Sequence, residues 1–220
     1  MPLTKTSQLL ELAEAGDDSL LRARVEASVA SVGFTTWVDN ALVTSLARLG
    51  EAAALDEIRG VKVGAIYRRL AKLARAVAPR KSTQINGRSA VVLVTPANGH
   101  TLAADLLSHL LLAEGYRADS LHPTDFDGDI FCGAVPDVVA VSIGLESEWR
   151  GLPDTLLKLR RRAPRALIMV GGSAVSNHRG AILPAGAVLC GGFAEALTTL
   201  RRSFAPNRAA NHVRQAATSV

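Results

Sequence analysis

The chain has 220 residues, a formal net charge of +5, 48% hydrophobic residues and only 4% aromatic ones. This length and apolar content suffice for one large core or two modest ones, and we expect two domains. No apolar run is long enough to cross a bilayer and the first residues lack a charged-then-apolar signal pattern, so we expect a cytoplasmic protein without a membrane partner.

From residue 4 to about residue 78, apolar residues recur with the period of an α-helix. The period breaks at three places, each with a side chain that can cap the next helix: residues 16–18, 33–36 and 55–57. Four helices with short connections predict a small four-helix bundle over residues 1–78. Residues 79–88 lose the period and gain polar and turn-forming residues, so we assign them to a linker.

Beyond the linker, short apolar strands alternate with helical segments. The predicted strands cover residues 90–95, 118–121, 138–142, 167–170 and 187–189, and the predicted helices cover about residues 101–114, 128–134, 152–162, 174–183 and 194–204. Five such units imply an α/β domain over residues 89–204, and we expect a flavodoxin-like five-stranded parallel sheet in the order 2-1-3-4-5. Residues 205–220 have little apolar content, which predicts a flexible tail.

Glycine and polar residues follow four of the predicted strands at their carboxyl ends. They are Asn98-Gly99-His100, Ser142-Ile143-Gly144, Gly171-Gly172-Ser173 and Cys190-Gly191-Gly192. In an open parallel sheet, ligands bind at this edge, in the crevice where the strand order reverses, so we expect His100 and Ser142 to be near neighbours there. The glycine pairs leave the backbone bare for an extended ligand. The sequence thus predicts a long groove that contains one candidate metal ligand, His100.

At these residues the chain resembles the cobalamin-binding domain shared by methionine synthase, base-off corrinoid mutases, corrinoid proteins and cobalamin-based light-sensing regulators. The family pattern Asp/Glu-x-His-x-x-Gly, Ser-x-Leu/Thr and Gly-Gly stands here as Asn98-Gly99-His100-Thr101-Leu102-Ala103, Ser142-Ile143-Gly144 and Gly171-Gly172. The resemblance implies that His100 is the lower axial ligand of cobalt. It also implies that Ser142 contacts the nucleotide tail of the cobalamin, which lies beside the glycine loops with Ser173, Gly191 and Gly192.

Three positions of the motif depart from the family pattern. A ligating imidazole normally donates its other N–H to a carboxylate, but Asn98 offers only a neutral amide oxygen, so we expect weaker cobalt ligation. Ala103 adds a methyl group where the family has glycine and narrows the expected groove. Gly144 replaces a larger residue and returns some room nearby.

The helical segment resembles the bundle that covers the corrin in the sensor members of the family. Where those members have tryptophan this chain has Ala53, and where they have Glu-His it has Val63-Gly64. The resemblance therefore implies neither an upper imidazole ligand nor the usual aromatic lid. Trp37, the only tryptophan of this segment, is expected to be a buried residue of the bundle core.

The other polar and charged residues that were considered as candidates are interpreted as structural or surface residues. Glu146 and Glu148 follow the Ser142 loop and are expected at the surface, and His178 has no partner at ligand spacing. Cys132 and Cys190 lack Cys-x-x-Cys spacing, which predicts reduced structural thiols. The basic cluster at residues 160–165 falls where a helix should end, so it complements the helix dipole, and we expect no direct DNA binding.

These observations predict a cytoplasmic, non-catalytic sensor or regulatory protein that couples the state of bound cobalamin to a transcription factor or signalling partner. Movement of the bundle relative to the sheet is the expected output. Two alternatives stay open: a corrinoid carrier protein for methyl transfer, and a degenerate domain that binds haem or no cofactor. The adenosyl, methyl or hydroxo form of the cobalamin and the formation of homo-oligomers also stay open.

Overall fold

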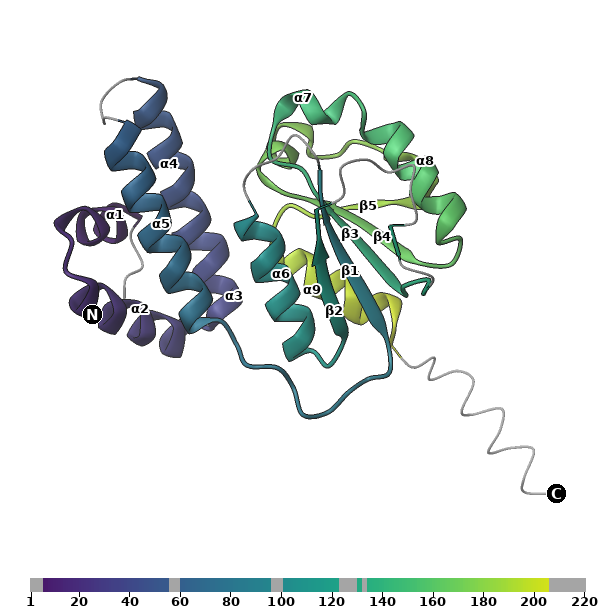
Figure 1. The fold of residues 1–220 in the computed structure, drawn as a ribbon, viewed down its shortest axis with the longest axis horizontal. Helices are drawn as coiled ribbons and strands as arrows, with labels where there is room; N and C mark the ends of the chain where they lie inside the picture. Colours follow the sequence, from purple (N-terminus) through teal and green to yellow (C-terminus); the bar gives the residue numbers. More distant parts are fainter. Residues whose placement is uncertain (1–5, 56–59, 96–100, 123–129, 132–133, 206–220) are drawn as a thin grey trace.

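Helices form the first part of the chain in the computed structural model, which describes residues 6–55, 60–95, 101–122, 130–131 and 134–205 (Figure 1). They are α1 (Thr6–Ala15), α2 (Asp18–Val32), α3 (Phe34–Trp37), the π-helix η1 (Val38–Leu42), α4 (Val43–Ala54) and α5 (Gly60–Val77). Because α3, η1 and α4 follow one another without a break, they form a single long helix with one π-helical turn. The predicted bundle of four helices, here called the helical bundle (α1–α5), is confirmed.

Local sequence explains where these helices begin and end. The Asp17 carboxylate accepts hydrogen bonds from the backbone N–H groups of Ser19 (3.1 Å) and Leu20 (2.9 Å), which caps α2. Gly33 ends α2 with φ = +84°, a conformation that glycine adopts without strain. Trp37 is only 1% exposed, so the prediction that it belongs to the bundle core is confirmed.

The strands of the second part of the chain form one parallel sheet in the order β2-β1-β3-β4-β5, which confirms the predicted flavodoxin-like topology. They are β1 (Ser89–Val94), β2 (Arg117–Leu121), β3 (Val138–Ser142), β4 (Leu167–Gly171) and β5 (Val188–Leu189). Ser142 pairs with Val94 on one side and with Gly171 on the other. The carboxyl ends of β1, β3 and β4 therefore lie level with one another at one edge, here called the carboxyl edge.

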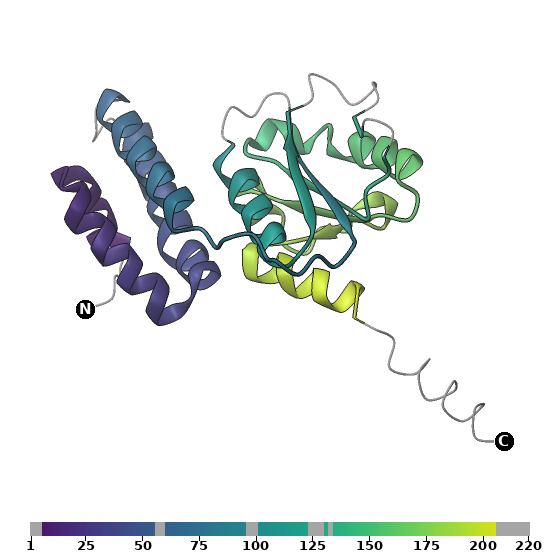
Figure 2. The same cartoon turned by 60° about the horizontal axis from the view of Figure 1, so that its bottom comes forward.

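Helices cover both faces of this sheet (Figure 2). They are α6 (Leu102–Ala113) and α9 (Phe193–Ser203) on one face, and α7 (Glu146–Trp149) and α8 (Leu152–Arg162) on the other. Alternate residues of β1 point to opposite faces, with Val92 in the core under α6 and α9 and Leu93 in the core under α8. The helical bundle packs outside α6 and α9, and its buried residues belong to the same apolar cluster as theirs.

Two predicted helices differ from the structure. Residues 174–183 were predicted as one α-helix, but the chain forms the short 3-10 helix η2 (Ser173–His178), a turn at Gly180 (φ = +89°) and the 3-10 helix η3 (Pro184–Gly186). Of the predicted helix at residues 128–134, Ile130 and Phe131 lie in a turn and Ala134 has no regular structure, and the rest lies outside the described residues. None of the helices in the described ranges is long and apolar enough to span a membrane.

Candidate functional site

The candidate site begins at the crevice between the carboxyl ends of β1 and β3, where the strand order reverses. Ser142 ends β3 and is only 8% exposed. The backbone N–H of Thr95, the residue after β1, donates a hydrogen bond of 3.4 Å to the Ser142 carbonyl. The ladder between the two strands therefore continues to the rim of the crevice.

Glu148 lies across this crevice. One oxygen of its carboxylate accepts a hydrogen bond from the Thr95 hydroxyl, and the other accepts from the backbone N–H groups of Gly144 (2.8 Å) and Leu145 (3.0 Å). The side chain thus joins the loop after β3 to the end of β1. The prediction of surface placement is wrong for Glu148, which is partly buried, and it is confirmed for Glu146, whose side chain is 58% exposed.

The glycine pair after β4 lies against the loop after β3. Gly172 has φ = +113°, and a Cβ on it would lie 2.1 Å from the Ile143 carbonyl oxygen. Ile143 donates its N–H to the Gly171 carbonyl at 2.9 Å, and Ser173 Oγ donates to the Gly144 carbonyl at 2.9 Å. Glycine is therefore required here by a close approach of the chain to itself.

The glycine pair after β5 contacts the helical bundle. A Cβ on Gly192 would lie 3.0 Å from Oδ1 of Asp39, a residue of the π-helix η1. The Asp39 carboxylate accepts hydrogen bonds from the backbone N–H groups of Phe193 and Ala194, both at 2.9 Å. Gly191 donates its N–H to Glu195 at 2.7 Å. The bundle thus reaches the carboxyl edge at the loop that follows β5.

A second polar cluster connects α7 to η2. His178 Nε2 lies 2.5 Å from Glu146 Oε1, and the amide of Asn177 donates to Glu146 Oε2 at 3.2 Å. The imidazole stacks on Trp149, with 3.7 Å between ring centroids and 3° between planes. The hydrogen bond from Asn177, followed by that from His178, lowers the pKa of Glu146 below its ordinary value. The sequence offered no partner for His178 at metal-ligand spacing, and the structure instead gives it a hydrogen-bond partner, Glu146, 32 residues earlier in the chain.

Burial governs the thiol of Cys190, which ends the β5 segment and is 4% exposed. Burial raises its pKa to about 11, and the neighbouring Glu195 carboxylate acts in the same direction. Since the thiolate is the reactive form, a thiol with this pKa is unreactive near neutral pH. This agrees with the structural role expected for it.

The predicted cobalt ligand lies outside the described residues, together with Asn98 and Gly99. The structure resumes at Thr101, whose hydroxyl donates to Asp105 at 3.2 Å, and α6 begins with the buried Leu102 and the half-buried Ala103. Across the described ranges, no three His, Cys, Asp or Glu side chains lie close enough together to hold a metal ion. The roles assigned to His100 and its neighbours stay predictions.

The described part of the carboxyl edge contains several polar groups. They are backbone groups, the hydroxyls of Thr95, Ser142 and Ser173, and the carboxylate of Glu148. The hydroxyls and backbone groups are neutral donors and acceptors, of the kind that bind ribose and amide groups, whereas the Glu148 carboxylate already accepts three hydrogen bonds within the protein.

Comparison with solved structures shows which fold this is. The structure is similar to that of the monomethylamine corrinoid protein of Methanosarcina barkeri, with a TM-score of 0.69 and 17% sequence identity over 90% of this chain and 97% of that chain. The chain has the fold of a corrinoid protein. Because the likeness covers 90% of the chain, it includes the helical bundle as well as the sheet. The resemblance derived from the sequence motifs is thus confirmed at the level of the fold.

Two further structures match with lower similarity. A cobalamin-binding protein from Desulfitobacterium hafniense DCB-2 has a TM-score of 0.44 at 15% identity, over 90% of this chain and 98% of that one. The methanol:cobalamin methyltransferase complex MtaBC from Methanosarcina barkeri has a TM-score of 0.38 at 14% identity, over 93% and 88%. Neither score supports an argument about this chain. No protein-family model and no curated protein matches the sequence.

Proposed function

We propose that the chain binds a corrinoid at the carboxyl edge of its sheet and acts as a carrier that presents this corrinoid to a separate protein partner. The observation that carries the proposal is the likeness of the whole chain, bundle and sheet together, to a corrinoid protein. This likeness favours the carrier alternative over the sensor role first expected from the sequence. A carrier of this kind is a cytoplasmic methyl-transfer component and is not itself an enzyme.

The chain's own residues bind and orient the cofactor in this proposal. His100 supplies the imidazole for cobalt, and Ser142, Gly144, Gly171, Gly172 and Ser173 line the place of the nucleotide tail. Cobalamin, when bound, supplies the cobalt centre that accepts and releases a methyl group. The hydrogen bonds of Glu148 keep the ends of β1 and β3 together beside that place.

Absorbance spectroscopy tests the proposal directly. The purified full-length protein is incubated separately with hydroxocobalamin, adenosylcobalamin and haemin, desalted, and scanned. We expect it to retain a cobalamin with a changed spectrum, and we expect His100→Ala to abolish the part of the change that depends on imidazole ligation. The circular dichroism of that variant should equal that of wild type.

The matched control is His109→Ala, because His109 is a half-buried histidine in the last turns of α6, and this helix begins at the carboxyl edge and runs away from it. This variant should bind cobalamin like wild type. Failure of the wild-type protein to retain any corrinoid would reject the proposal. Retention of haemin alone would support the alternative of a degenerate domain that binds haem.

A sensor or regulatory role is the second candidate, and two observations favour it. Asn98 stands where a carboxylate would strengthen the ligating imidazole, and this weakens the controlled ligation that methyl transfer requires. Asp39 connects the carboxyl edge to the bundle, a route by which cofactor binding could reach a transcription factor or signalling protein. A sensor would change amide exchange in α1 and α2 when hydroxocobalamin binds, whereas a carrier would change it only at the carboxyl edge.

A further inference from the structure

Asp39 makes a contact that joins two distant parts of the chain. Its two carboxylate oxygens accept one hydrogen bond each, at 2.9 Å, from Phe193 and Ala194, which lie 154 and 155 residues further along the sequence. These two N–H groups belong to the first turn of α9, where a helix leaves its donors without partners of its own. A carboxylate at this position also interacts favourably with the helix dipole.

The backbone on both sides of this contact is specialised for it. Asp39 lies in a π-helical turn, a rare distortion that shifts side chains relative to a regular α-helix. On the other side Gly192 has no Cβ, and one placed there would lie 3.0–3.1 Å from the three atoms of the Asp39 carboxyl group. An alanine at Gly192 would require the carboxylate to shift by a few tenths of an ångström.

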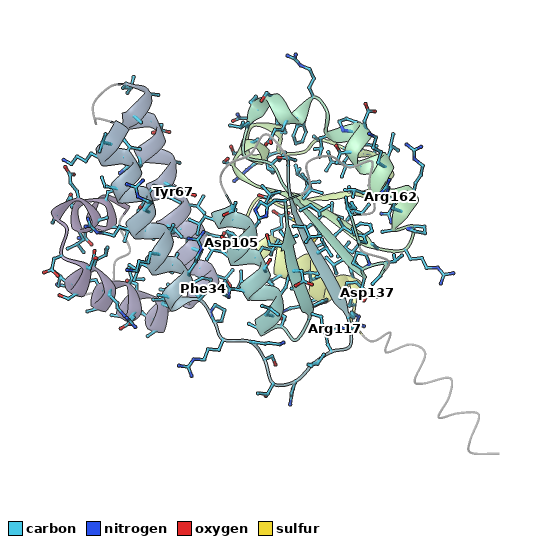
Figure 3. All side chains as sticks on the ribbon, viewed as in Figure 1. Phe34, Tyr67, Asp105, Arg117, Asp137 and Arg162 are labelled. Carbon is cyan, nitrogen blue, oxygen red and sulfur yellow. The ribbon has the colours of Figure 1, made fainter. Side chains whose placement is uncertain are left out.

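An ion pair also joins the bundle to the α/β part. Arg75 of α5 bonds to Asp105 of α6 at 2.6 Å, with side chains that are 43% and 26% exposed. Figure 3 shows Tyr67 and Asp105 on these two facing helices. Exposed ion pairs contribute little to stability because water screens them. Asp39 adds to this ion pair a contact in which both carboxylate oxygens accept hydrogen bonds from the backbone of α9.

We propose that Asp39 is a positioning residue of the carboxyl edge: from the bundle it holds the start of α9, and with it the Gly191-Gly192 loop, in place for the cofactor. The effect of Asp39 on the cofactor rests on the proposed corrinoid binding, whereas its effect on the start of α9 does not. Loosening the bundle contact is expected to loosen the loop after β5, which makes this loop responsive to the position of the bundle.

Two measurements on the full-length protein test the inference. In Asp39→Ala, the exchange rates of the Phe193 and Ala194 amides should rise about tenfold, because both lose an ionised acceptor. The Kd for hydroxocobalamin should rise by about the same factor. Asp39→Asn keeps one acceptor oxygen, so it should restore part of both effects.

Asp17→Ala is the matched control, since it also removes a carboxylate that accepts two backbone N–H groups, at α2 and away from the carboxyl edge. It should leave the α9 amides and the Kd unchanged. The inference is overturned if Asp39→Ala leaves either the exchange of the α9 amides or the Kd unchanged. It is also overturned if Asp17→Ala raises the exchange of the α9 amides as much as Asp39→Ala does. Amide exchange is measured without any corrinoid. If the wild-type protein binds no corrinoid, the proposed function is rejected, but the exchange data still decide whether Asp39 stabilises the start of α9.

Discussion

At the scale of single residues, Gly172 has the most constrained backbone of the candidate site. Its φ of +113° disfavours any side chain, and the Ile143 backbone occupies the space that a Cβ would need. The turn that it makes brings Ser173 to the Gly144 carbonyl. A glycine at position 172 is therefore needed for the loops after β3 and β4 to pack against each other.

We predict that Gly172→Ala lowers the free energy of unfolding by at least about 2 kcal/mol, since it combines backbone strain with a steric clash. The midpoint of urea unfolding measures this. Gly180→Ala is the control, because Gly180 also has a positive φ (+89°) but no atom within 4 Å of the added Cβ, and it should cost about 1 kcal/mol. Equal losses in the two variants would show that the close approach to Ile143 is unimportant.

Residue types also explain which parts of the candidate site could be expected from the sequence. Ser142 ends a buried strand and Gly172 directly follows one, so their place at the carboxyl edge follows from the strand pattern alone. Asp39, Glu148 and His178 could not be predicted this way. Asp39 and His178 have partners 154 and 32 residues away, and Glu148 bonds to Thr95, 53 residues away, as well as to its own loop. The helical or strand period of a short segment contains no information about such distant contacts.

At the scale of secondary structure, the short helix α7 determines where Glu148 lies relative to the ends of β1 and β3. It turns the chain directly after β3, so that Glu148 faces back toward its own loop and toward Thr95. The element was missed in the sequence because four residues are too few to show a helical period. The crevice between β1 and β3 is consequently bridged by a side chain that the sequence pattern placed at the surface.

We predict that Glu148→Ala lowers the free energy of unfolding by about 1–3 kcal/mol, because three donors lose an ionised acceptor. Amide exchange at Gly144 and Leu145 should rise in the same variant. Glu146→Ala, a neighbouring carboxylate on the exposed side of α7, should leave both amides unchanged. Protection of Gly144 and Leu145 that survives in Glu148→Ala would contradict this prediction.

The segment after β4 shows where a helical pattern fails. Residues 174–183 contain apolar residues at helical spacing, yet the chain turns at Gly180 and continues to Pro184 without an α-helix. Asn177 and His178 end the 3-10 helix η2 and bond to Glu146 of α7. Here contacts with another element outweighed a weak local preference.

At the scale of the whole molecule, one apolar cluster extends from the bundle to the sheet. It includes Leu21 and Trp37 of the bundle, Leu106 of α6, Leu197 of α9 and Val92 of β1. Burial of this continuous core is the main stabilising contribution shared by the two parts. The division of the chain into two domains, joined by a linker at residues 79–88, stays a prediction.

We predict that the bundle and the α/β part unfold together, because their cores are continuous. In Trp149→Phe, the fluorescence of the buried Trp37 reports on the bundle, and far-UV circular dichroism reports on all helices. The two urea transitions should share one midpoint. A circular dichroism curve with two steps, of which only one coincides with the Trp37 transition, would contradict the prediction.

The sequence by itself determined the classes of structure: the helical bundle, the five parallel strands and the carboxyl edge at which glycines and Ser142 gather. These follow from periods of a few residues, which reflect which faces of a helix or strand are buried. Tertiary structure alone decided that Asp39 reaches α9, that Glu148 bridges β1 and β3, and that Gly172 touches Ile143. Such contacts depend on how finished elements pack, because hydrogen bonds and close approaches are set by distances of a few ångströms between segments far apart in the chain.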